Sequence, residues 1–221
     1  MEPSQVESID GAENLRRDAR MLERALPACR VAVIDRACLS VGVFPRDSAG
    51  PVRRAEAAGI PVVHRSTGGS AVLVGRGDIA WSIVLPREDR RVGRDYVHAY
   101  RRFGHGVVAG LAPWIPDVAW APGPALLPEL CYLSGRGEVL GARDRIVGGA
   151  AQHRTGGALL HHGLIGFELD RSILARLFDL PPGADRRLGG LVDLGVTARP
   201  ETLAEAVRQG LAREIEGNAA P

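Results

Sequence analysis

The loop over residues 64–71 (HRSTGGSA) combines side chains that can bind a negatively charged or carbonyl-bearing ligand. Its two adjacent glycines can adopt backbone dihedrals closed to other residues, and they let a ligand approach the main chain. Successive N–H groups in such a turn can form a concave anion site beside the Arg65 guanidinium and the hydroxyls of Ser66 and Thr67. The alternative is a plain turn between two hairpin strands, since Gly-Gly turns are common there.

Two adjacent histidines and three cysteines are the other candidates for chemistry. His161 and His162 lie in one apolar run that predicts a strand, so their side chains point to opposite faces. We expect one of them to belong to the core and the other to line a pocket, and no metal site from this pair alone. The cysteines are Cys29, Cys38 and Cys131, and so sparse and odd a set does not indicate a disulfide framework.

The composition is that of an ordinary globular protein, with 45% hydrophobic and 24% charged residues among 221. The net charge of +2 is too small to indicate binding to nucleic acid or to an anionic membrane. No apolar run approaches the ~20 residues that a membrane helix needs, and the N-terminus is too polar for a signal peptide. We therefore expect a cytoplasmic protein. The sequence has no Walker A motif, and all 28 basic residues are arginine.

Apolar periodicity predicts the elements that must position these residues. Helical spacing indicates long helices over residues 11–27, 94–111 and 200–215, and shorter ones over 52–58 and 171–178. Strands are predicted over residues 29–34, 39–44, 60–63, 71–74, 78–85, 118–120, 138–140, 145–148 and 158–169. The fold class is α+β, with mixed, largely antiparallel sheets flanked by helices. We expect a disordered N-terminus over residues 1–11 and a single domain over residues 12–216.

Three ordered stretches together resemble a known family. They are residues 65–72 followed by 77–86, then Cys131-Tyr132 with 135–139, and then 145–154 (RIVGGAAQHR) followed by 157–163. In order and spacing they are similar to the catalytic domain shared by lipoate–protein ligases and octanoyltransferases, and more distantly by biotin–protein ligases. That family carries an "RRxTGG" loop, a "K-I-x-G-x-A-Q" segment and an "hHG" strand. The resemblance extends over about residues 12 to 214.

The resemblance implies a sheet that cradles a medium-length acyl chain in an apolar tunnel. The glycine loop would form one wall of the tunnel and hold the polar end of the substrate. The substrate-binding residues implied in this way are Arg65, Ser66, Thr67, Gly68, Gly69, Ser70, Ala71, Gly148, Gly149, Ala150, His161, His162 and Gly163.

Cys131 occupies the place of the nucleophile in the cysteine-dependent octanoyltransferases of this family. The resemblance implies that it takes an acyl group from acyl carrier protein as a thioester. It would then pass the group to a lysine of a lipoyl-domain protein or of a glycine-cleavage H-type protein, without a cofactor. Thioesters exchange readily with thiolates, so this chemistry suits a cysteine. The alternative is a buried, inert thiol.

The second implied catalytic residue is Arg145, which stands where the family has a lysine. Arginine keeps the positive charge but cannot accept a proton at neutral pH. The segment between Ile146 and Gln152 also has one apparent extra residue. Two alternatives to the transferase stay open. One is a ligase that activates free lipoate or octanoate with ATP and Mg²⁺, and the other is a non-catalytic paralogue that binds acyl ligands or lipoyl domains.

Overall fold

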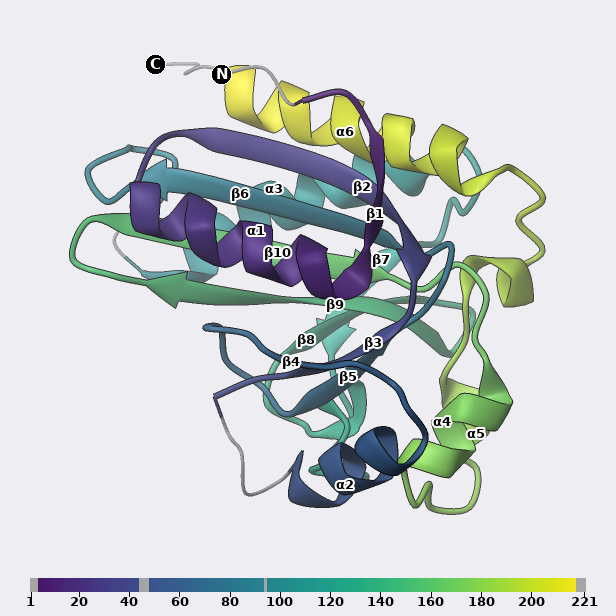
Figure 1. The fold of residues 1–221 in the computed structure, drawn as a ribbon. Coiled ribbons are helices and arrows are strands. Elements are labelled where there is room, and N and C mark those ends of the chain that lie inside the picture. The colour runs from purple at the N-terminus through teal and green to yellow at the C-terminus, as the bar shows by residue number, and fades with distance from the viewer. Residues whose placement is uncertain (1–3, 44–47, 94, 218–221) are drawn as a thin grey trace.

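The computed structural model describes residues 4–43, 48–93 and 95–217. A seven-stranded sheet forms the centre of the molecule (Figure 1). In spatial order its strands are β1 (Glu7–Asp10), β2 (Ala28–Arg36), β6 (Ile79–Pro86), β10 (Ala158–Ile165), β9 (Arg145–Arg154), β8 (Glu138–Ala142) and β7 (Ala119–Pro122). All neighbouring pairs are antiparallel except β1 and β2. The mixed, largely antiparallel α+β fold is confirmed.

Two long helices, α3 (Tyr96–Leu111) and α6 (Pro200–Glu216), cover one face of this sheet. Their apolar residues recur at helical spacing and pack against Trp81 and Ile83 of β6, which leaves Phe103 and Val107 of α3 fully buried. Asp95 caps α3 by accepting a hydrogen bond from the backbone N–H of His98 at 2.8 Å. Among the described residues, no helix combines the length and the apolar character that a membrane crossing requires.

Helix α1 (Gly11–Arg24) and a small second sheet lie on the opposite face (Figure 1). The Asp10 carboxylate caps α1 through the N–H of Glu13 at 3.0 Å. The strand that precedes the helix, β1, pairs in parallel with β2 and buries Ile9. The expectation of disorder over residues 1–11 is therefore wrong for residues 7–11, because the edge of β2 supplies hydrogen bonds that polar composition does not reveal.

The small sheet has the order β4 (Val62–His64), β3 (Cys38–Val41) and β5 (Ala71–Val74). Both outer strands pair with β3, β4 in parallel and β5 in antiparallel fashion. The hairpin interpretation of the glycine loop is therefore wrong. Because β3 lies between the two strands that the loop joins, residues 65–70 cross over the end of β3 and bond to it, for example from the Gly42 N–H to the Ser70 carbonyl at 3.1 Å.

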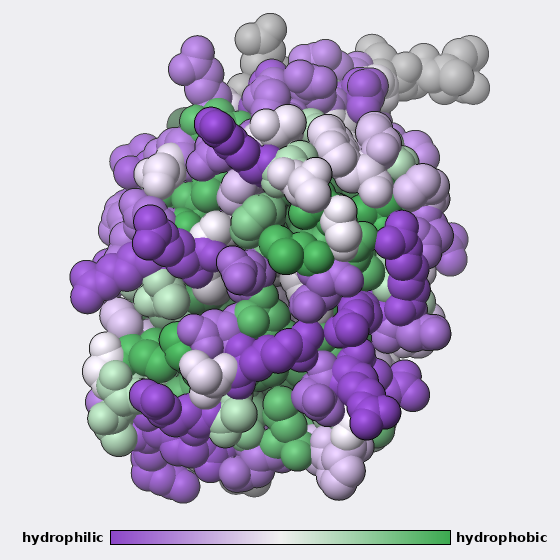
Figure 2. All heavy atoms as spheres, turned by 90° about the vertical axis from the view of Figure 1, so that its right-hand side faces the viewer, coloured by the Kyte–Doolittle hydropathy of each residue, from purple (hydrophilic) through white to green (hydrophobic). Residues whose placement is uncertain are grey.

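Short helices pack around the small sheet and the loops beside it, namely α2 (Ala49–Ala57), α4 (Arg171–Leu177) and α5 (Ala184–Arg187), with 3-10 turns at Cys131–Leu133 and Leu191–Leu194. On the side of the molecule shown in Figure 2, hydrophobic residues come to the surface in several separate areas between hydrophilic ones. Strand β10 ends at Ile165, before the predicted end at residue 169, and β9 extends beyond its predicted end to Arg154.

Candidate functional site

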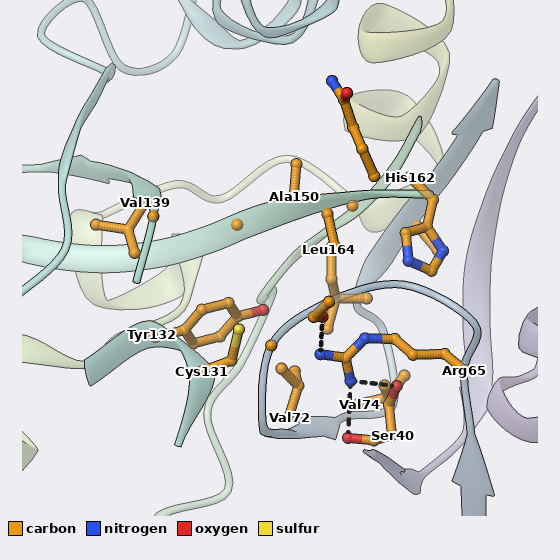
Figure 3. A pocket seen from close by; sticks show the side chains of 18 of the residues that line it. Ser40, Arg65, Val72, Val74, Cys131, Tyr132, Val139, Ala150, His162 and Leu164 are labelled. Atoms are coloured by element: carbon orange, nitrogen blue, oxygen red, sulfur yellow. Dashed lines mark hydrogen bonds between the residues drawn. The ribbon is translucent and has the colours of Figure 1, made fainter. Parts of the chain in front are cut away.

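A cavity of about 240 Å³ opens between the large sheet, the small sheet and α1 (Figure 3). Apolar side chains from four elements form much of its wall, namely Leu15, Val72, Val74, Val139 and Leu164. Cys131, Arg65 and His162 bring polar groups into the same lining. The cavity therefore combines a wall suited to an aliphatic chain with a small polar end that holds a thiol.

Arg65 uses all of its hydrogen-bonding capacity inside the loop and β3. Its Nε donates to Thr67 Oγ1 at 3.1 Å, and its Nη1 donates to the carbonyl and hydroxyl oxygens of Ser40 at 3.1 and 3.0 Å. Its Nη2 donates to the carbonyls of Gly68 and Ser70 at 2.8 and 3.0 Å. A guanidinium has five N–H donors, so none remains for a ligand. The substrate-binding role of Arg65 stays a prediction, and its hydrogen bonds favour a role in shaping the loop.

The charge of Arg65 still acts on the cavity. The side chain is buried, and no carboxylate pairs with it among the residues that the structure describes. Burial lowers the pKa of Arg65. Arg65 therefore contributes positive electrostatic potential to the cavity, but no hydrogen-bond donor.

The thiol of Cys131 lies directly against the glycine loop. A Cβ placed on Gly69 would stand 2.6 Å from Cys131 Sγ and 2.8 Å from Arg65 Nη2. Gly69 also has a φ of +93°, which other residues rarely adopt. Only glycine at this position lets sulfur and guanidinium share one side of the loop.

Replacing Gly69 with alanine is expected to displace Cys131 Sγ and to strain the loop, at a cost of about 1–3 kcal/mol in unfolding free energy. The rate at which iodoacetamide alkylates Cys131, measured by intact mass, should differ from that of the unchanged protein. Urea unfolding should show the lower unfolding free energy. Gly156→Ala is the matched control, because a Cβ there meets nothing within 4 Å. Equal behaviour of the two variants would contradict the close contact.

His162 and Thr67 link the loop to the sheet. Thr67 Oγ1 lies 2.8 Å from His162 Nε2, and His162 Nδ1 lies 2.7 Å from Asp18 Oδ2 on α1. His162 is 7% exposed and lines the cavity, whereas Thr67 is fully buried behind it. The polar end of the cavity is thus held by a continuous chain of side chains from α1, β10 and the loop.

His161 points to the opposite face of β10, as strand alternation predicts. Its ring stacks edge-on with Tyr100 at 5.1 Å between centroids and lies 5.5 Å from Phe103. Burial first, and the neighbouring His162 second, lower its pKa to about 3. His161 does not line the cavity of Cys131. It belongs to the core beneath α3, so its binding role stays a prediction that this placement does not favour.

The depressed pKa of His161 predicts acid destabilisation. In the unfolded chain His161 takes up a proton near pH 6.5, but in the native core only near pH 3. The unfolded state therefore binds more protons between these values, and stability is lost as the pH falls through this window, by up to about 1.4 kcal/mol per pH unit. Urea unfolding from pH 7 to 4 should show a weaker dependence in His161→Phe. An unchanged slope would contradict the buried neutral ring.

The structure does not bring Arg145 to Cys131. Its Nη1 donates to the carbonyls of Leu188 and Arg186 at 3.4 and 3.5 Å, and the residue is not part of the cavity wall. The next two residues of β9, Ile146 and Val147, line a second cavity of about 630 Å³. The catalytic role of Arg145 stays a prediction, and its contacts favour a structural role.

The apparent extra residue before Gln152 coincides with a β-bulge. Strand β8 pairs Leu140 with Gly148 but Gly141 with Ile146, so two steps of β9 oppose one step of β8. A bulge accommodates one additional residue without loss of the flanking ladder. The strand therefore keeps its register with β10 up to Arg154.

The cavity includes only part of the predicted site. Cys131, Arg65, Gly68, Gly69, Gly149, Ala150, His162 and Gly163 line it, whereas Ser66, Thr67, Ser70, Ala71, Gly148, His161 and Arg145 do not. Sequence reasoning missed Ser40, Tyr100 and Tyr132, which also line it. The aromatic residue after the cysteine was the one available signal for Tyr132. Its ring packs where Gly149 has no side chain, since a Cβ there would stand 2.8 Å from Tyr132 Cε1.

Comparison with other sequences finds relatives that share much of this chain. An octanoyltransferase LipM from Carboxydothermus hydrogenoformans is 30% identical over 178 residues, covering 77% of this chain and 66% of the relative. A second, from Brevibacillus brevis, is 24% identical and covers 98% of this chain and 87% of the relative. The chain spans 66%, 53% and 56% of the length of three of the relatives it matches.

Solved structures share the fold. A lipoate-protein ligase A bound with ATP superposes with a TM-score of 0.75 at 21% identity, over 98% of this chain and 86% of that one. A biotin protein ligase from Aquifex aeolicus superposes with a TM-score of 0.55 at 11% identity, over 97% of this chain and 70% of that one. The sequence profile of the lipoyl protein ligase A/B catalytic domain matches residues 10–212. Because that match spans nearly the whole chain, the protein belongs to the lipoyl protein ligase A/B catalytic-domain family.

Proposed function

We propose that this protein transfers an octanoyl or lipoyl group to a lysine of a lipoyl-domain or glycine-cleavage H-type protein, through a thioester on Cys131. One observation carries the proposal. The Cys131 thiol lies in an acyl-sized apolar cavity, against Gly69 and beside the buried charge of Arg65. Relatives named octanoyltransferase support the same class of reaction.

The reaction has two steps. First, the Cys131 thiolate attacks the carbonyl carbon of an acyl thioester carried by acyl carrier protein. The carrier's thiolate leaves and takes up a proton, so the acyl group is held as a new thioester. Second, the neutral amine of the acceptor lysine attacks that thioester. An amide forms, the amine loses its proton to solvent, and Cys131 is released as the thiolate.

Other parts of the cavity suit this substrate. Leu15, Val72 and Val74 would contact the acyl chain, which leaves the carbonyl near the loop. The transferase needs no cofactor. A ligase that uses ATP and Mg²⁺ is the alternative, since a ligase bound with ATP shares the fold. The hydrogen bonds of Arg65 disfavour it, because that guanidinium has no N–H left to hold a phosphate.

The test is intact mass spectrometry after mixing the protein with octanoyl-acyl carrier protein. An octanoyl adduct on Cys131 that transfers to a lipoyl-domain protein supports the proposal. Protein without an adduct that makes acyl adenylate from ATP and lipoate establishes the ligase instead. Binding of octanoate with neither activity establishes a non-catalytic paralogue, and both of these outcomes overturn the transferase.

The Arg145→Gln variant tests whether the reaction of Cys131 depends on Arg145, the second residue that the resemblance implies to be catalytic. We expect this variant to form the Cys131 adduct at a rate within about threefold of the unchanged protein, because the hydrogen bonds of Arg145 go to carbonyls outside the cavity. The rate is measured by quenching the acyl carrier protein reaction at short times. A loss of more than about a hundredfold would instead place Arg145 in the catalytic machinery.

A further inference from the structure

A buried carboxylate on α1 begins the hydrogen-bond chain that ends at the glycine loop. Asp18 is 2% exposed. Its Oδ1 accepts from Ser82 Oγ at 2.5 Å and from Arg30 Nη1 at 3.0 Å, while its Oδ2 faces His162 Nδ1 at 2.7 Å. Both oxygens are therefore occupied, and the guanidinium of Arg30 forms an ion pair with this carboxylate.

This carboxylate sets the direction of each bond that follows. A carboxylate oxygen accepts hydrogen bonds, so the contact with Asp18 favours the His162 tautomer whose N–H is at Nδ1. In that tautomer Nε2 is an acceptor, and the Thr67 hydroxyl at 2.8 Å is its donor. That hydroxyl oxygen in turn accepts from Arg65 Nε at 3.1 Å. Each group thus donates to the next: Arg65 to Thr67, Thr67 to His162, and His162 to Asp18.

This series of hydrogen bonds is connected to Cys131 by the planar guanidinium of Arg65. The Nε bond to Thr67 fixes one edge of that plane, and the Nη2 bonds to Gly68 and Ser70 fix the backbone on both sides of Gly69. Gly69 is the residue against which the Cys131 sulfur lies. A change in the direction of the Thr67 hydroxyl would therefore alter the surface that holds the sulfur.

We infer that Asp18 is a positioning residue for Cys131, acting through His162, Thr67 and Arg65. The inference deepens the proposed function and rests on it only in taking Cys131 as the nucleophile. Asp18 does not itself line the cavity, and it reaches the lining only through its contact with His162. Its effect is to select the His162 tautomer that lets Thr67 accept from Arg65 and donate to the ring.

Asp18→Asn tests this inference. The amide oxygen is required by Arg30 and Ser82, so the amide N–H₂ faces His162 and moves the ring proton to Nε2. The Arg65 Nε–H and the His162 Nε2–H then both point at Thr67 Oγ1, and the Thr67 proton loses its acceptor. We expect alkylation of Cys131 by iodoacetamide to slow by about tenfold or more, as with other carboxylates that set a histidine tautomer. Asp78→Asn, the same change at a carboxylate that is 4% exposed, should leave the rate unchanged.

A double-mutant cycle distinguishes positioning from a general loss of stability. Thr67→Val removes the hydroxyl through which Asp18 acts, so Asp18→Asn should slow alkylation no further in that background. Equal slowing in both backgrounds would overturn the inference.

The unchanged protein provides an independent test, which remains valid if a variant fails to fold. Nitrogen chemical shifts should show His162 protonated at Nδ1 and not at Nε2, and a proton on Nε2 would overturn the inference. Neither readout depends on acyl transfer, so failure of the proposed function is separately visible.

Discussion

Replacing Cys131 with alanine is expected to abolish the acyl adduct and to reduce acyl transfer by roughly three orders of magnitude or more. No other thiol can take its place. Cys29 and Cys38 are buried in strands, and burial raises the pKa of each thiol to about 12. At neutral pH both therefore remain protonated and shielded from an acyl donor. The measurement is adduct formation by intact mass, together with transfer of octanoyl to a lipoyl-domain protein.

Cys131→Ser provides a second, nearly isosteric variant. It keeps the shape of the site, so loss of the adduct can be assigned to the sulfur rather than to repacking around Gly69. Cys38→Ser is the matched control in the core and should retain the adduct if it folds. Transfer that persists in both Cys131 variants would contradict the thioester route.

Replacing Arg65 with methionine is expected to have the second largest effect, because one side chain satisfies several buried acceptors. The carbonyls of Ser40, Gly68 and Ser70 would lose the Arg65 donor together, and the Ser70 carbonyl would keep only the Gly42 N–H. A buried acceptor left unpaired costs about 1–3 kcal/mol. Since the loop can partly relax, we expect the unfolding free energy to fall by about 3–5 kcal/mol, the loss of two or three such acceptors. Urea unfolding measures this change.

The same variant should also slow alkylation of Cys131, because the positive charge beside the sulfur is gone. Arg65→Lys keeps a charge but has three donors in place of a planar fork of five, so it should recover part of the reactivity and little of the stability. Arg53→Met on the exposed side of α2 is the control and should change stability by less than about 0.5 kcal/mol. A stable Arg65→Met protein would contradict the role assigned to this side chain.

The periodicity of apolar residues along the chain was sufficient to predict most of the helices and strands. The helical spacing of Leu203, Val207 and Leu211 predicted α6, and the alternation along β10 placed His161 and His162 on opposite faces. The order of the motifs identified the family, and the family implied the sheets. Strand β1 was missed because a four-residue polar segment carries no periodic signal, and its pairing with β2 decides its conformation.

By itself, the sequence determined the family, the α+β class and the candidates Cys131 and Arg65. Only the tertiary structure decided what each candidate does. It inserted β3 between the two strands that flank the glycine loop, and it consumed every donor of Arg65 within that loop. It also joined Asp18 to His162 across 144 positions of the chain. The physical reason is that spacing along a chain reports the face of one element, whereas hydrogen-bond partners from distant elements are set by how those elements pack.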